Sequence, residues 1–410
     1  MPQTRQDVRT RRVFYIPGYD PIHPRRYREL YRKEGADQAA ISDYALSLSP
    51  KTSKGHYGWQ VTAQMDGVEV ETEVEVLVWS DIVRSSMSNT IPATYLQLIR
   101  TAWIYIGSGT LRRLMRLRKG PVIAALYPVG MLLVQALIAL GLGWAMFGLV
   151  TALLAPLLGS VATVLGLVGW IGVAVAVLRW FKQKDGKIFA YYLMHDYAYS
   201  ARWNGANPPE LEARMAEFTE IIADALRSPV DEVLVIGHSS GAHLAVSILA
   251  DLIRQGRAPA NGPALSFLSL GQVVPMLSFL PKADRLRADL HDLAARKELT
   301  WVDVTAPGDG CAFALCDPVA VSGVAPEGKL WPLVFSAQFT KSLSPERWKT
   351  LRWKFFRLHF QYLCAFDQPL DYDYFRITAG PVTLGARYAG RPPSASRIDV
   401  AVSKYTSRAA

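Results

Sequence analysis

Hydrophobic and polar residues follow distinct periods in different parts of this chain. Residues 59–65 and 68–79 alternate apolar and polar side chains around Asp66-Gly67, which predicts a β-hairpin with a type I′ turn. The unbroken aliphatic run at 233–236 predicts a strand covered on both faces, and further strands are predicted at 12–16, 264–274 and 299–305. Apolar residues at helical spacing separate several of these strands. The pattern predicts an α/β fold with a mostly parallel sheet flanked by helices.

A long uncharged block interrupts this pattern between Gly120 and Leu178. One straight helix of that length would measure roughly 88 Å, about three times the ~30 Å hydrocarbon thickness of a bilayer, so the block must fold back. We expect two membrane-spanning helices near residues 121–150 and 161–180, with a turn around residues 156–160. A hairpin that enters and leaves one leaflet is the alternative, because the turn is itself apolar.

Small residues in the second predicted span offer a surface for the first span. Gly166, Gly169 and Gly172 recur on one side, with Ala162 one turn earlier. Lysine and arginine residues flank the outer ends of both spans, and the positive-inside rule then places both termini in the cytoplasm.

The segment from Leu98 to Lys119, just before the block, is amphipathic. Its apolar side includes Trp103 and Ile106, and its arginines lie on the other side, as at Arg112 and Arg116. Such a segment suits the headgroup boundary of a bilayer. An ordinary helix that packs on a protein core is the alternative, in particular for the first half of the segment.

Composition agrees with a membrane location. The chain has 410 residues, 50% of them hydrophobic, and a formal net charge of +10, which an anionic lipid surface accounts for more simply than a nucleic acid does. No nucleic-acid-binding motif is present. Three cysteines give no disulfide pattern, and Cys311 and Cys316 lack partners at zinc-site spacing, so no metal or other cofactor is expected. The N-terminal residues contain no apolar signal segment.

One short motif carries candidate chemistry. The aliphatic strand at 233–236 leads into Gly237-His238-Ser239-Ser240-Gly241, and the residues that follow have helical spacing. A Gly-x-Ser-x-Gly frame between a strand and a helix forms a tight turn that exposes the serine hydroxyl. The chain resembles the α/β-hydrolase superfamily of serine esterases and lipases in this respect. The resemblance makes Ser239 the nucleophile and Gly237 and Gly241 the glycines of the elbow.

The resemblance also assigns an oxyanion hole. In this superfamily a loop after an early strand supplies one backbone N–H, and the residue after the serine supplies the other. The strand at 12–16 ends in Pro17-Gly18-Tyr19, so the two donors fall on Tyr19 and Ser240. This loop departs from the superfamily's usual His-Gly pattern.

A nucleophilic serine needs a histidine base and an acid that orients it, and in this superfamily both follow the serine, with the acid first. Only His243, His291 and His359 follow Ser239. His243 lies on the helix after the elbow, and His291 precedes the strand that should carry the acid. His359 is therefore predicted as the base. His238, beside the serine, is expected to have a packing role.

The acid is expected in a loop at the carboxyl end of a strand. The strand at 299–305 is followed by Asp309 and later by Asp317, and Asp309 is favoured because it is closer to the strand end. Asp317 stays the alternative acid. Asp303 would point into the sheet layer and is a weaker candidate.

These observations predict a hydrolase domain with a membrane insertion. Residues 1–85 and 187–385 form the two parts of the α/β domain, 86–186 the amphipathic segment and hairpin, and 386–410 a mostly disordered tail. The resemblance implies a serine hydrolase that cleaves an apolar acyl ester, with the lipid bilayer as its partner and the hydrolase domain in the cytoplasm. A catalytically inactive partner-binding module and an acyltransferase are the alternatives. Oligomeric state is open.

Overall fold

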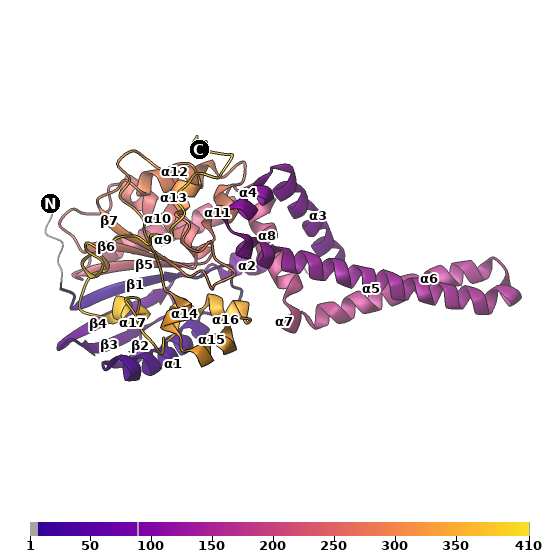
Figure 1. The fold of residues 1–410 in the computed structure, drawn as a ribbon, viewed down its shortest axis with the longest axis horizontal. Helices are drawn as coiled ribbons and strands as arrows, with labels where there is room; N and C mark the ends of the chain where they lie inside the picture. The colour runs from indigo at the N-terminus through magenta and orange to yellow at the C-terminus, as the bar shows by residue number, and fades with distance from the viewer. Residues whose placement is uncertain (1–6, 88–89, 410) are drawn as a thin grey trace. The chain divides into compact units, whose positions relative to one another are not determined.

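The computed structural model describes residues 7–87 and 90–409, and its centre is one eight-stranded sheet (Figure 1). The strand order is β2-β3-β4-β1-β5-β6-β7-β8. β3 runs antiparallel to its neighbours β2 and β4, and every other neighbouring pair is parallel. The predicted mixed α/β architecture is therefore confirmed. The strands are β1 (Thr10–Ile16), β2 (Ala45–Pro50), β3 (Gly58–Met65), β4 (Val68–Val76), β5 (Glu232–His238), β6 (Ala264–Leu270), β7 (Leu299–Thr305) and β8 (Leu333–Ser336).

The β3–β4 hairpin turns as the sequence predicts. Asp66 and Gly67 have φ angles of 54° and 75°, the left-handed values that a type I′ turn requires. β4 ends at Val76, three residues before the predicted end, and β6 ends at Leu270 because Val274 already begins a helix. The sequence analysis missed β2, a partly exposed edge strand, and β8, which has only four residues.

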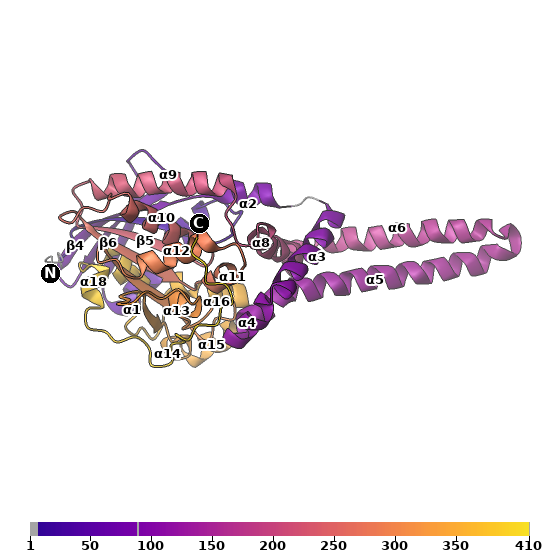
Figure 2. The ribbon, with the colours of Figure 1, turned by 90° about the horizontal axis from the view of Figure 1, so that it is seen from above.

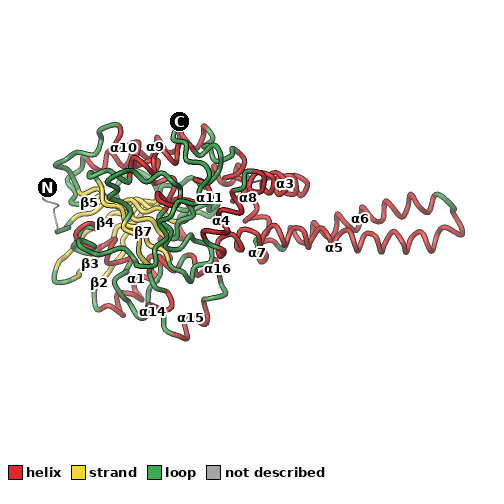
Figure 3. Tube along the Cα trace, turned by 45° about the horizontal axis from the view of Figure 1, so that its top comes forward, coloured by secondary structure: helices red, strands yellow, loops and turns green. Residues whose placement is uncertain are grey.

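Helices cover both faces of the sheet (Figure 1 and Figure 3). A buried cluster on one face joins the side chains of β1, β4, β5, β6 and β7 to α1 and to several helices of the C-terminal region. The helices on this face are α1 (Arg25–Ser42), α14 (Phe339–Ser342), α15 (Pro345–Leu351), α16 (Phe355–His359), α17 (Tyr374–Ala379) and α18 (Leu384–Arg387), with the short 3-10 helix η1 (Gln361–Leu363). The opposite face carries α9 (Pro209–Leu226), α10 (Gly241–Arg254), α11 (Val274–Ser278), α12 (Asp284–Leu293) and α13 (Pro318–Val321).

β5 shows why an unbroken aliphatic run forms a central strand. Every residue of β5 is buried, because Leu234 and Ile236 enter the cluster on the α1 face while Val233 and Val235 point to the opposite face. Burial of each such side chain contributes about 1.5–3 kcal/mol. The strand that carries the serine turn is thus fixed from both sides.

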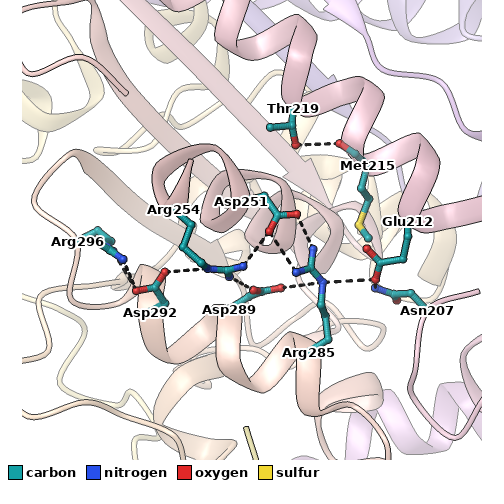
Figure 4. A network of polar contacts seen from close by, with 10 residues as sticks. All are labelled: Asn207, Glu212, Met215, Thr219, Asp251, Arg254, Arg285, Asp289, Asp292 and Arg296. Atoms are coloured by element: carbon teal, nitrogen blue, oxygen red, sulfur yellow. Dashed lines mark hydrogen bonds and ion pairs between the residues drawn. The ribbon is translucent and has the colours of Figure 1, made fainter. Parts of the chain in front are cut away.

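An ion-pair network ties α9, α10 and α12 together (Figure 4). Arg285 of α12 contacts Asp251 of α10 at 2.5 Å and Glu212 of α9 at 3.4 Å. Arg254 of α10 reaches back to Asp289 and, at 3.3 Å, to Asp292 of α12. Asp289 is only 1% exposed, so its charge needs both arginines. This network fixes α12, and with it the start of β7, against the elbow helix α10.

The second compact unit is helical and is formed by Ser85–Gly107 and Val122–Arg202, while the rest of the chain forms the unit that contains the sheet. Its helices are α3 (Ile91–Gly107), α5 (Lys119–Leu158), α6 (Val161–Gln183), α7 (Asp185–Ile188) and α8 (Ala190–Arg202), with α5 beginning in the sheet unit. α5 and α6 run side by side in opposite directions (Figure 1 and Figure 2). Both are long and apolar enough to cross a membrane, with mean hydropathies of 2.2 and 2.4.

The hairpin turn is tighter than the sequence suggested. α5 continues through Pro156 to Leu158, so the turn consists of Gly159, with φ 55°, and Ser160. The helix that carries the first expected span therefore continues beyond residue 150. Pro156 has no N–H to donate to the carbonyl four residues earlier, so the last turns of α5 lack one hydrogen bond of the regular helix.

Part of the predicted small-residue surface of α6 packs on α5. A Cβ atom added to Gly166 would meet Phe147 at 2.8 Å, and one added to Gly169 would meet Met146 at 3.2 Å. Gly172 lies away from this contact, since a Cβ there meets nothing within 4 Å. On α5 itself, Gly143 makes room for the ring of Trp170.

The predicted amphipathic segment is two helices rather than one. α3 ends at Gly107 and α4 (Thr110–Leu117) starts after Gly109, whose φ of 73° breaks the helix. Leu114 on α4 is fully buried in the sheet unit, and Leu98 on α3 is buried in a cluster with residues of α5 and α8, although Trp103 on α3 is 79% exposed. The alternative of a helix packed on a protein core therefore describes α4 and one side of α3.

The tail after Arg387 is ordered, contrary to expectation. Ile398 forms a bridge with Cys316, and the N–H of Val402 donates to the carbonyl of Val321. The side chain of Arg287 donates to the carbonyl of Ser407 at 2.7 Å. The tail has few apolar side chains to bury, so these hydrogen bonds hold it against the sheet unit instead. Such long-range hydrogen bonds cannot be read from composition.

Candidate active site

The serine turn has the geometry of a strained elbow. β5 ends at His238, α10 begins at Gly241, and Ser239 between them has a φ of 57°, which residues other than glycine rarely adopt. The N–H of Ser239 donates to the carbonyl of Leu270 on the neighbouring strand at 2.9 Å. The side chain is half-buried. The turn thus holds the hydroxyl at the carboxyl end of the parallel strands.

Two glycines are sterically required for this turn. A Cβ atom on Gly241 would lie 2.1 Å from the carbonyl oxygen of Ile16, and one on Gly237 would lie 2.6 Å from the Cα of Ala242. Neither position leaves room for a side chain. The elbow residues expected from the sequence are therefore glycines for a steric reason.

The loop after β1 lies against the serine, as the oxyanion-hole assignment requires. A Cβ atom on Gly18 would approach the Cβ of Ser239 to 3.0 Å and its Oγ to 3.4 Å. Tyr19 follows directly and is buried, and Ser240 is the N-cap residue of α10. Donation to an oxyanion by the N–H groups of Tyr19 and Ser240 stays a prediction.

Asp309 and His359, 50 residues apart in sequence, are joined by a hydrogen bond. His359 Nδ1 lies 2.7 Å from Asp309 Oδ2, and both side chains are buried. Because a carboxylate only accepts, Nδ1 donates this hydrogen bond. The pair therefore orients the imidazole ring and leaves Nε2 available for a reacting group, as the base of a hydrolase requires.

Two further donors hold the Asp309 carboxylate. The Cys311 N–H donates to Oδ1 at 2.9 Å, and the Tyr362 hydroxyl donates to Oδ2 at 3.0 Å while accepting from the N–H of Ala306. Burial raises the pKa of Tyr362 well above its usual value, and the Asp309 charge adds to the effect, so the phenol stays a donor. Sequence reasoning missed Tyr362, and its place three residues after His359 was the only signal.

The alternative acid, Asp317, is engaged elsewhere. It caps the N-terminus of α13, accepting from the N–H groups of Val319 and Ala320, both at 3.0 Å, and it pairs with Lys329 at 2.5 Å. These contacts account for the side chain structurally. The structure brings Asp309, and not Asp317, to the predicted histidine.

His238 fixes the backbone of His359. Its Nε2 lies 3.0 Å from the His359 carbonyl, which can only accept, so Nε2 donates and Nδ1 accepts from the Tyr15 hydroxyl at 3.2 Å. Burial lowers the pKa of His238 to about 3, and neighbouring His359 adds to the effect. His238 is therefore neutral at pH 7, which agrees with its expected packing role.

The serine and the imidazole share one end of the sheet without being hydrogen-bonded. Among the described residues, the Ser239 hydroxyl has no hydrogen-bond partner. His359 lies beside Gly271, where an added Cβ would come within 3.1 Å of its Cε1, and Gly271 directly follows the Leu270 that binds the Ser239 N–H. Catalytic hydrogen bonds are often long before a substrate binds. A hydrogen bond between Ser239 and His359 in the substrate-bound protein stays a prediction.

Within the part of the chain that the structure describes, Asp309, Cys311 and His359 form a group that could hold a metal. One potential ligand atom of each lies within 4.8 Å of the others. The Asp309 carboxylate, however, is already bonded to His359, Tyr362 and the Cys311 N–H, so a metal would have to displace existing hydrogen bonds. The expectation that no metal or cofactor is needed stays a prediction.

Asp303 lies inside the sheet, as expected, and its buried carboxyl has a testable consequence. It is 0% exposed on β7, burial raises its pKa well above the usual value, and nearby Asp317 adds to the rise. A carboxyl with a raised folded-state pKa contributes most at low pH and loses stability as the pH rises from its unfolded-state pKa toward its folded-state pKa.

We therefore expect Asp303→Asn to raise the melting temperature more at pH 8 than at pH 5, by a few degrees, since about 1 kcal/mol shifts the melting temperature of a domain this size by roughly 2–4 °C. Thermal unfolding of the detergent-solubilised protein across this pH range measures the difference. The control is Asp37→Asn, at an exposed position on α1. A gain that is the same at both pH values would contradict the explanation.

Comparison with known proteins gave no guide to function. No protein family, curated protein or solved structure matched this chain. Its function must therefore be inferred from the arrangement of its own residues.

Proposed function

We propose that this chain is a membrane-anchored serine hydrolase of the α/β-hydrolase type that cleaves an apolar acyl ester. The observation that carries the proposal is the hydrogen bond between His359 and the buried Asp309, located at the sheet end where strained Ser239 also lies. The sequence order of the three residues agrees with that superfamily. Strain at a non-glycine residue is typical of functional positions.

In the proposed mechanism, the Ser239 Oγ attacks the ester carbonyl while His359 Nε2 accepts the hydroxyl proton. Asp309 holds the imidazole tautomer and stabilises the imidazolium that forms. The N–H groups of Tyr19 and Ser240 donate to the oxyanion. His359 then returns the proton to the leaving alcohol, and the acyl group stays on Ser239. A water molecule next attacks this acyl-enzyme while His359 accepts its proton, and His359 passes the proton to the Ser239 Oγ as the acid leaves.

The membrane anchor in this proposal is the α5–α6 hairpin. Its two apolar helices, together with flanking lysines and arginines, support two spans with both termini and the hydrolase domain in the cytoplasm. An active site tethered in this way stays near the bilayer, where apolar esters concentrate.

Labelling with a fluorophosphonate tests the catalytic proposal directly. The probe phosphonylates an activated serine and releases fluoride, so we expect the folded protein to be labelled and the heat-denatured protein to remain unlabelled. Peptide mass spectrometry should locate the adduct on Ser239. A folded wild-type protein that does not react would contradict the proposal and favour a non-catalytic binding module.

Formation of an acyl-enzyme is also compatible with transfer to an acceptor other than water. Product analysis in the presence of a competing alcohol distinguishes the two reactions. We expect the free acid to be the main product, whereas an ester of the added alcohol as the main product would instead indicate an acyltransferase.

A further inference from the structure

A cavity of about 440 Å³ borders the acid of the proposed triad and lies entirely within the sheet unit. Two stretches form its wall: residues 115–121, which include the end of α4, and the loop 307–314, which contains Asp309. Cavities of 300–1,000 Å³ are typical of small-molecule sites. Because Asp309 lines this cavity and binds His359, a molecule inside it would lie next to the acid of the proposed catalytic pair.

The charges around the cavity are unbalanced. Arg116 and Lys119 line it, both are exposed, and neither forms an ion pair or hydrogen bond among the described residues. Asp309 is the one acidic residue among those that line the cavity, and its carboxylate is 2% exposed and already accepts three hydrogen bonds. The cavity therefore presents two uncompensated cations to a ligand.

A third cation in the wall has a structural role. The Arg118 side chain donates to the carbonyl of Ala314 at 2.9 Å and thereby connects the two stretches that form the cavity. Gly120 lies against Gly310, where an added Cβ would be 3.6 Å from the Gly310 Cα. These contacts fix the two stretches relative to each other. They do not involve the side chains of Arg116 and Lys119, which can therefore contact a ligand.

Apolar residues complete the wall, Leu117, Pro121, Pro307 and Ala312 among them. Two free cations beside an apolar surface match a molecule that has both an anionic group and a hydrocarbon part. From this combination we infer that the cavity binds an amphiphilic anion, an alkyl chain that carries a phosphate or a carboxylate. This step rests on the proposed function: the ester substrate belongs to this class of molecule, and its anionic group lies between Arg116 and Lys119.

Binding is tested without turnover on the full-length Ser239→Ala protein. Isothermal titration with hexyl phosphate, inorganic phosphate and hexanol separates the two halves of the ligand. We expect hexyl phosphate to bind at least tenfold more tightly than either of the others. Equal affinity for hexyl phosphate and inorganic phosphate would contradict the inference that the ligand is amphiphilic and would indicate a simple anion site.

The double substitution Arg116→Ala/Lys119→Ala is expected to weaken hexyl phosphate binding about tenfold or more, since each charge-assisted hydrogen bond contributes substantially to affinity. The control, Arg112→Ala/Lys297→Ala, removes the same net charge from two exposed positions that do not line the cavity. Undiminished binding in the first variant, or an equal loss in both, would overturn the inference.

Hydrolysis then tests the link to catalysis in the protein with Ser239 intact. We expect Arg116→Ala/Lys119→Ala to lower kcat/KM for the anionic mono-p-nitrophenyl succinate about tenfold more than kcat/KM for p-nitrophenyl butyrate, whereas Arg112→Ala/Lys297→Ala should leave both within twofold. An equal loss on both esters would overturn the cavity's role in substrate choice. If neither ester is hydrolysed by any variant while hexyl phosphate still binds, the proposed hydrolase activity fails and the anion site stands.

Discussion

Ser239→Ala is expected to lower kcat/KM for p-nitrophenyl butyrate by at least about 10⁴-fold and to abolish fluorophosphonate labelling. Without the Oγ there is no atom to form the acyl-enzyme, and only binding and oxyanion stabilisation remain. Alanine keeps the Cβ that the elbow already accommodates at a φ of 57°, so the fold should persist. Thermal unfolding in parallel verifies that the variant is folded.

Ser240→Ala is the matched control for this substitution. Ser240 is adjacent and also a serine, but its proposed contribution is its backbone N–H, which alanine retains. We expect its activity to stay within a few-fold of the wild type. If Ser239→Ala kept its activity, or if both variants lost it equally, Ser239 would not be the nucleophile.

Local sequence patterns predicted the parts of the fold that depend on local physics. The type I′ hairpin at Asp66-Gly67 needs two residues that tolerate positive φ, and β5 needs an aliphatic run because both faces are covered. The elbow glycines follow from backbone contacts within and beside one turn. Each of these features is encoded within about ten residues, so the sequence alone identifies it.

Features that depend on distant parts of the chain were harder to predict. The choice between Asp309 and Asp317 depends on which of the two side chains reaches His359. The residues around each aspartate do not reveal its distance from a histidine that lies much later in the sequence. The order of the tail likewise depends on backbone bonds to residue 321 and on Arg287. The cavity joins α4 to a loop some 190 residues later, and no periodicity links the two.

Asp309→Asn is expected to lower kcat/KM by about 10⁴-fold, because an amide in that position no longer favours the Nδ1–H tautomer of His359. An asparagine NH₂ directed at Nδ1 would make that nitrogen an acceptor and put the proton on Nε2, where it blocks acceptance from the serine. The Tyr362 hydroxyl can still donate to the remaining amide oxygen, so the loop should keep its shape. Ester hydrolysis and thermal unfolding of the purified variant measure the two effects separately.

Asp317→Asn makes this test specific. Both acids are buried, both follow β7, and both accept backbone N–H groups, but only Asp309 contacts the imidazole. Asparagine retains the cap of α13 and loses the Lys329 ion pair, so Asp317→Asn should lower stability modestly and leave kcat/KM within a few-fold. The opposite result, with activity lost in Asp317→Asn and kept in Asp309→Asn, would mean that the hydrogen bond between Asp309 and His359 is structural and that the acid of the site lies elsewhere.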